Sequence, residues 1–203
     1  MAEISIDEIK KLKELTGVGL TDAKKALTEA GGDFDAALEA MRKKGLTKAE
    51  KRGEREAREG LIEAYVHSGR IGVLVELNCE TDFVARTDEF KNLAHDLALQ
   101  VAAMNPKWVA TADIPAAEMA RKKDELLAAA KTDAKNAKKP AEVLDKIIQG
   151  QLDKYFGELV LMEQIFWKDG ETRVGDLVKN AAAKLGENVV VGRFERIELG
   201  VNE

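Results

Sequence analysis

Residues 60–79, GLIEAYVHSGRIGVLVELNC, decide the fold of this 203-residue chain. Apolar and polar residues alternate on both sides of the turn sequence HSGR, and this period of two predicts two strands joined as a β-hairpin. The second strand would carry its apolar residues on one face: Ile71, Val73, Val75 and Leu77. One face of the hairpin therefore needs a partner, which the neighbouring segments must supply.

The segments that follow the hairpin predict helices and one further strand. Residues 87–104, TDEFKNLAHDLALQVAAM, have the helical period of apolar residues and end at Asn105-Pro106. Further helices are expected from Pro115 to about Lys131, from Pro140 to about Tyr155, and over Val174–Leu185. The apolar residues 158–170 are expected to be extended, and residues 187–199, ENVVVGRFERIEL, predict a strand that joins the hairpin. The fold class is therefore α+β, a small antiparallel sheet packed by helices.

The residues before the hairpin divide into a small unit and a linker. Residues 1–46 predict three short helices: Ser5 and Glu8 form a capping box for the first, Thr21 can cap the second, and Asp33 or a neighbour starts the third. Residues 47–59 contain almost no apolar side chains and are interpreted as a charged linker. Residues 60–203 then form the α+β core domain.

Composition narrows the classes of function. The charged residues, 34% of the chain, are mixed in sign with a net charge of -5, which argues against direct binding of nucleic acid. No segment has the run of about 20 apolar residues that a membrane span needs, and the first residues resemble neither a signal peptide nor a transit peptide. With Cys79 as the only cysteine, no disulfide can form within the chain. We therefore expect a soluble protein of the cytoplasm that contacts no membrane.

The residue types that carry out catalysis or hold metals are sparse. His67 and His95 are the only histidines, and neither has a cysteine or carboxylate at ligand spacing. Cys79 ends a strand, which favours a small buried side chain over a reactive thiol. The sequence predicts no metal and no cofactor, and a protein that works by binding and is not an enzyme.

One short connection carries unexpected residues. In NCETDFVAR, residues 78–86, a carboxylate and a large aromatic, Asp82 and Phe83, stand between a strand and a helix. From the residues alone two interpretations are open. Phe83 could be part of the core with Asp82 as the N-cap of the next helix, or the pair could project from a rigid base into a partner.

Three segments resemble the bacterial elongation factor Ts family: residues 10–45, residues 72–86 and residues 185–194. The first is similar to the family's amino-terminal domain, which has a three-helix, ubiquitin-associated-like fold. The second contains the family's Thr-Asp-Phe-Val motif, here Thr81, Asp82, Phe83 and Val84. With one hairpin, one motif and one terminal strand, the chain resembles the short form of the family.

The resemblance implies a function and partners. It implies guanine nucleotide exchange on elongation factor Tu, GDP-bound or nucleotide-free, with Asp82 and Phe83 inserted beside the nucleotide so that the Mg²⁺ site is disturbed. It implies a second contact through Leu20 and Thr21, although many relatives have methionine at both positions. The single small sheet leaves an apolar face that a second copy could cover, giving a homodimer or a 2:2 complex. The alternative is a non-catalytic adaptor whose amino-terminal unit binds ubiquitin-like proteins.

Overall fold

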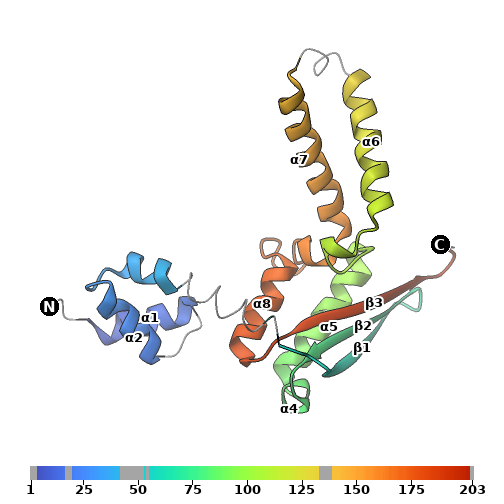
Figure 1. The fold of residues 1–203 in the computed structure, drawn as a ribbon. Coiled ribbons are helices and arrows are strands. Elements are labelled where there is room, and N and C mark those ends of the chain that lie inside the picture. The colour runs from blue at the N-terminus through green and yellow to red at the C-terminus, as the bar shows by residue number, and fades with distance from the viewer. Residues whose placement is uncertain (1–3, 17–19, 42–52, 54, 133–138, 202–203) are drawn as a thin grey trace.

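Figure 1 shows the fold in a computed structural model that describes residues 4–16, 20–41, 53, 55–132 and 139–201. The amino-terminal unit contains α1 (Ile6–Thr16), α2 (Leu20–Glu29) and a helical stretch over residues 34–41. The strands are β1 (Glu59–His67), β2 (Ile71–Cys79) and β3 (Val190–Glu198). The helices of the core are α4 (Asp82–Ala85), α5 (Asp88–Met104), α6 (Ala116–Thr132), α7 (Ala141–Leu159) and α8 (Val174–Leu185). The α+β fold class is confirmed.

The sheet is antiparallel, with the order β1-β2-β3. Tyr65 pairs with Val73 in the hairpin, and Val75 pairs with Phe194 on the other side of β2. The hairpin and the strand that joins it are therefore as the sequence predicts. Near the far end of β2 Asn78 pairs with Val190, so the residues just before β3 lie beside the residues just after β2.

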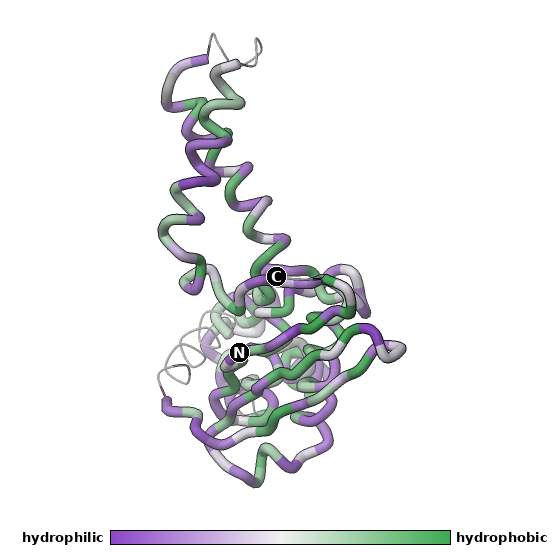
Figure 2. The backbone as a smooth tube through the Cα atoms, turned by 90° about the vertical axis from the view of Figure 1, so that its right-hand side faces the viewer, coloured by the Kyte–Doolittle hydropathy of each residue, from purple (hydrophilic) through white to green (hydrophobic). Residues whose placement is uncertain are grey.

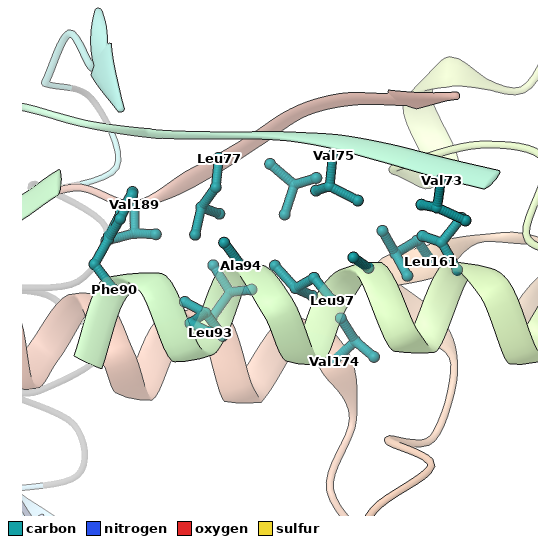
Figure 3. Close-up of a cluster of buried hydrophobic side chains, with 14 of the residues drawn as sticks. Val73, Val75, Leu77, Phe90, Leu93, Ala94, Leu97, Leu161, Val174 and Val189 are labelled. Carbon is teal, nitrogen blue, oxygen red and sulfur yellow. The ribbon is translucent and has the colours of Figure 1, made fainter. Parts of the chain in front are cut away.

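Helices α5 and α8 cover one face of this sheet (Figure 1). Val73, Val75 and Leu77 point from β2 toward α5 (Figure 3). On the helix side they meet Phe90, Leu93, Ala94 and Leu97, with Val174 behind them. All eight of these side chains belong to one buried cluster, which is the core that holds the base of the Thr-Asp-Phe-Val connection.

The amino-terminal helices have an apolar cluster of their own, formed by Leu12, Ala23, Ala26, Leu27, Ala37 and Met41. The capping box is confirmed: Glu8 N donates to Ser5 Oγ at 3.1 Å, and Ser5 N donates to Glu8 Oε2 at 3.0 Å. Asp33 starts the third helix, because its Oδ1 accepts from the backbone N–H groups of residues 35 and 36. The expectation for Thr21 is wrong: α2 already begins at Leu20, so Thr21 lies inside the first turn.

The predicted domain boundaries fall mostly outside the described residues. The end of the first unit at residue 46 and the linker residues 47–52 and 54 lie there, so the boundaries stay predictions. At the other end of the linker, β1 begins at Glu59, one residue earlier than expected.

The expectation of an extended segment at residues 158–170 is wrong. Glu158 and Leu159 end α7, residues 161–163 form a 3₁₀ turn, and only isolated bridges follow. The physical reason is that the segment finds its backbone partners outside a regular strand ladder: Leu161 N and Met162 N donate to the carbonyls of Trp108 and Val109. The buried side chain of Gln100 on α5 supplies two more partners. Its Nε2 donates to the carbonyl of Ile165 at 3.1 Å, and its Oε1 accepts from Trp167 N at 2.9 Å.

Helices α6 and α7 leave the body side by side as a two-helix arm (Figures 1 and 2). Their own apolar cluster contains Ile114, Ile148, Leu152, Phe156 and Val160. Figure 2 shows hydrophilic and hydrophobic residues mixed along both helices, as expected for a pair that packs only against itself. The sequence predicts both helices but does not indicate that they project from the core.

Candidate functional site

The Thr-Asp-Phe-Val connection forms a single helical turn, α4. Thr81 is its N-cap: the residue has extended backbone angles, and its Oγ1 accepts from Val84 N at 3.4 Å. The next helix, α5, has its own N-cap in Thr87, whose Oγ1 accepts from Phe90 N. The interpretation of Asp82 as an N-cap is therefore wrong, because two threonines fill both cap positions.

Phe83 is 79% exposed, although it stands between a strand and a helix that both contribute to the core. Its neighbours face the other way: Val84 packs against the main apolar cluster and Ala85 is buried in it. The short turn thus separates its residues into a side that packs on the core and a side that faces solvent. The interpretation of Phe83 as a core residue is excluded.

Asp82 lies on the same turn and is held by a local ion pair. Its Oδ2 accepts from Arg86 Nη2 at 2.8 Å, between positions i and i+4. The Asp82 side chain remains 46% exposed. A carboxylate and an aromatic ring are therefore both accessible on this turn.

A carboxylate from the other end of the chain holds the base of the connection. Glu187, between α8 and β3, accepts through Oε2 from Glu80 N at 3.1 Å and from Thr81 N at 3.0 Å. Its Oε1 accepts from the Thr81 hydroxyl at 2.6 Å. The sequence interpretation missed Glu187. The only signal was its place in the segment 185–194, because pairing between residues 106 apart cannot be read from local pattern.

Cys79 lies directly beneath this connection and is fully buried. Its Sγ donates to the carbonyl of Thr81 at 3.1 Å. Burial raises the pKa of the Cys79 thiol, and the negative charge of Glu187 raises it further. A thiol that stays protonated is a poor nucleophile, so Cys79 has the structural role that its position predicts.

Leu20 and Thr21 open α2, and both are exposed. Leu20 is 51% exposed and lies outside the apolar cluster of the amino-terminal unit. A large apolar side chain left in solvent at a helix start is available for a contact with another molecule.

The two histidines lie on either side of Tyr65. His67 Nδ1 and the Tyr65 hydroxyl are 2.9 Å apart, and His95 Nδ1 lies 2.8 Å from Glu63 Oε1. His95 thus has a carboxylate partner from β1 that its sequence spacing does not reveal. Within the described part of the chain, no group of three or more His, Cys, Asp or Glu side chains could hold a metal ion.

A cavity of about 370 Å³ lies near these histidines, between the hairpin end of the sheet and the last turns of α5. Its walls include Ile71, Leu99 and Trp167, and Arg196 lines one side. Arg196 already pairs with Glu198 at 2.8 Å. The cavity is at the opposite end of β2 from Phe83 and takes no part in the site described above.

Among the described helices, none is long and apolar enough to cross a membrane.

Comparison with known proteins agrees with the resemblance carried by the motifs. The family model "Elongation factor TS" matches residues 9–201. Elongation factor Ts of Herpetosiphon aurantiacus is 52% identical over 200 residues, which cover 98% of this chain and 99% of that protein. Elongation factor Ts of Thermotoga petrophila is 53% identical over 199 residues, 98% of this chain and 97% of that protein. This chain belongs to the elongation factor Ts family.

Proposed function

We propose that this protein is the guanine nucleotide exchange factor for elongation factor Tu in translation elongation, and that it acts in the cytoplasm by promoting release of GDP. The observation that carries the proposal is the 79% exposure of Phe83. The side chain that the family motif would insert into the partner is the one that this fold leaves in solvent.

Insertion of Asp82 and Phe83 beside the nucleotide would act through the Mg²⁺ ion. Mg²⁺ requires near-ideal octahedral geometry and bridges protein groups to phosphate oxygens, so a small displacement of its ligands weakens nucleotide binding. Phe83 supplies the bulk that displaces them. The Asp82 carboxylate, oriented by Arg86, supplies a polar contact beside it.

Exchange of this kind is a coupling between two binding events. The protein must bind nucleotide-free elongation factor Tu more tightly than the GDP-bound form, and GDP must then weaken its binding by the same factor. No chemical step and no cofactor are needed. Leu20, with Thr21 beside it, would add a second contact that binds both forms of the partner.

We further propose that two copies of this chain pair through the outer face of the sheet, alone or in a 2:2 complex with elongation factor Tu. Four apolar side chains share that face and are exposed: Ile62 by 65%, Val66 by 66%, Leu74 by 49% and Ile197 by 75%. The register supports a common face, because Val66 and Ile197 both lie opposite Gly72. A group of exposed apolar side chains on one sheet face is typical of an interface, and a two-fold axis lets one patch cover its own copy.

Sedimentation of the Ile62→Lys variant tests the pairing. We expect wild type to sediment as a dimer at tens of micromolar and Ile62→Lys as a folded monomer. Val143→Lys, on the exposed surface of α7, is the matched control and should remain a dimer. A wild-type monomer both alone and with elongation factor Tu contradicts the proposed dimer.

Release of fluorescent GDP from elongation factor Tu tests the main proposal. With excess unlabelled nucleotide present, a substoichiometric amount of this protein should accelerate the loss of signal over many turnovers. A protein that binds a ubiquitin-like partner and leaves GDP release unchanged would instead be the adaptor. Unchanged release overturns the proposed exchange function.

A further inference from the structure

We propose that Glu187 is a positioning residue for nucleotide exchange, which holds the Thr-Asp-Phe-Val turn at the angle from which Phe83 enters the partner. This inference rests on the proposed function. Glu187 touches neither nucleotide nor partner in this role. It acts through the backbone of the turn that carries Phe83.

The turn needs an external support because it cannot orient itself. A helix of one turn, such as the four residues of α4, has too few internal hydrogen bonds to be stable alone. Phe83, being exposed, makes no core packing that could fix its direction. Val84 and Ala85 anchor one side of the turn to the core, and the direction of the Phe83 side chain then depends on how residues 80 and 81, at the start of the turn, are held.

Glu187 holds these residues with both of its carboxylate oxygens. One oxygen accepts from two successive backbone N–H groups, of Glu80 and Thr81, and the other accepts from the Thr81 hydroxyl. The same hydroxyl oxygen accepts from Val84 N and so caps α4. Glu187 thus fixes the rotamer of the capping side chain as well as the backbone before it. Hydrogen bonds to a charged acceptor are stronger than neutral ones, which suits a support for an exposed turn.

Hydrogen bonds run in both directions between the connection after β2 and the connection before β3, which makes the support rigid. While Glu187 accepts from Glu80 N, the Glu80 carboxylate accepts from Asn188 N at 2.6 Å. The Asn188 side chain, which is buried, then donates to the carbonyl of Arg55 at 2.7 Å. The two connections, after β2 and before β3, are therefore tied to each other and to the segment that enters β1.

Three substitutions at position 187 separate positioning from charge and from bulk. In Glu187→Gln the amide oxygen can take the two backbone N–H groups and the NH₂ group can donate to the Thr81 hydroxyl. In Glu187→Asp the charge remains, but the carboxylate is one methylene too short. We expect Glu187→Gln to keep GDP release close to the wild-type rate. We expect Glu187→Asp and Glu187→Ala to slow it about tenfold or more, since small misplacements of a group that must be precisely positioned cost this much.

Glu171→Ala is the control, an exposed glutamate before the opposite end of α8, and should leave both GDP release and the melting temperature unchanged. Equal rates for the Gln, Asp and wild-type proteins would overturn the proposal. Only Glu187→Ala loses every hydrogen-bond acceptor at this position. If that variant does not fold, the GDP release rates of Glu187→Gln and Glu187→Asp still test the proposal.

A double-mutant cycle with Phe83→Ala distinguishes positioning from general stability. If Glu187 acts through Phe83, Glu187→Asp should slow exchange about tenfold in wild type and not at all in Phe83→Ala, while its effect on melting is the same in both. Equal slowing in both backgrounds overturns the positioning role. If Phe83→Ala promotes GDP release at the wild-type rate, the proposed function fails. If Phe83→Ala is slow but Glu187→Asp promotes release at the wild-type rate, only the positioning role of Glu187 fails.

Discussion

At the scale of single residues, the feature that matters most is that Phe83 is exposed while Val84 and Ala85, on the same turn, pack on the core. Thr81 and Thr87 cap two successive helices, and the short turn between them carries Phe83 outward. The sequence alone leaves a core Phe83 open, because a strand followed by a helix is compatible with either direction of one aromatic side chain. Thr81, Asp82, Phe83 and Val84 are found from the sequence only by resemblance, and Glu187 is not found at all.

Gly60 is a position where the site depends on backbone geometry. Its φ is +150°, and a Cβ there would overlap the carbonyl oxygen of Leu77 in the neighbouring strand. We expect Gly60→Ala to lower the free energy of unfolding by about 3 kcal/mol, because strain and overlap add. Thermal and urea unfolding measure this change.

Gly150→Ala is the matched control for that substitution. Gly150 lies in α7 with open space around it, so alanine should raise stability by about 0.5–1 kcal/mol through its higher helix propensity. Equal stability of Gly60→Ala and wild type would mean that the close approach of β1 to β2 is not required.

At the scale of elements, the molecule separates a rigid sheet from a projecting arm. Elements with a clear period are predicted well: the hairpin, α5, α8 and β3 all lie where the sequence indicates. Residues 158–170 are not predicted well, because their backbone partners are irregular: the 108–109 segment bonds Leu161 and Met162, and the buried Gln100 side chain bonds residues 165 and 167. The periodicity of apolar residues gives no sign of such partners. The direction of α6 and α7 is likewise missed, since a pattern of apolar residues identifies a helix face and not its partner.

The arm should be dispensable for folding of the core. Replacing residues 121–147 with a short glycine-serine linker keeps its basal cluster, including Ile148 and Phe156, and leaves the main cluster untouched. We expect a cooperative unfolding transition within about 3 °C of wild type. Circular dichroism measures the transition and the loss of helix together.

Leu97→Ala is the control for the sensitivity of this measurement. Leu97 is fully buried beneath the sheet, and its truncation should cost about 2–5 kcal/mol. If the shortened protein is destabilised as much as Leu97→Ala, the arm and the core are a single cooperative unit.

At the scale of the whole molecule, residues near the end of the predicted linker are tied to the α+β core. Asn188 donates to the carbonyl of Arg55 at 2.7 Å, inside the range that composition assigns to the linker. A polar, charged segment does not reveal such a contact, because the acceptor is backbone and every residue has one. The α+β class and the separate three-helix cluster are predictable from pattern; this junction is not.

Two truncations test where the core begins. Removing residues 1–48 should leave cooperative melting of the core nearly unchanged and weaken binding to elongation factor Tu, because Leu20 is lost. Removing residues 1–57 should also cost about 1–3 kcal/mol, because it leaves the buried Asn188 amide without its acceptor. Calorimetry compares the two truncated proteins. If the protein that lacks only residues 1–48 has no cooperative transition, the amino-terminal unit and the core are one domain.

GDP release from elongation factor Tu driven by Phe83→Ala, measured with and without Mg²⁺, tests whether Phe83 promotes exchange by disturbing the Mg²⁺ site. Because Phe83 is 79% exposed, its truncation should change stability by no more than about 0.5 kcal/mol. We expect a wild-type melting curve, acceleration of GDP release reduced more than about tenfold with Mg²⁺ present, and a deficit that shrinks when EDTA removes the ion. Val143→Ala, which truncates another exposed apolar side chain, should exchange normally. Insertion of Phe83 is not the cause of exchange if Phe83→Ala exchanges at the wild-type rate, and it does not act through Mg²⁺ if the loss of exchange is the same after EDTA.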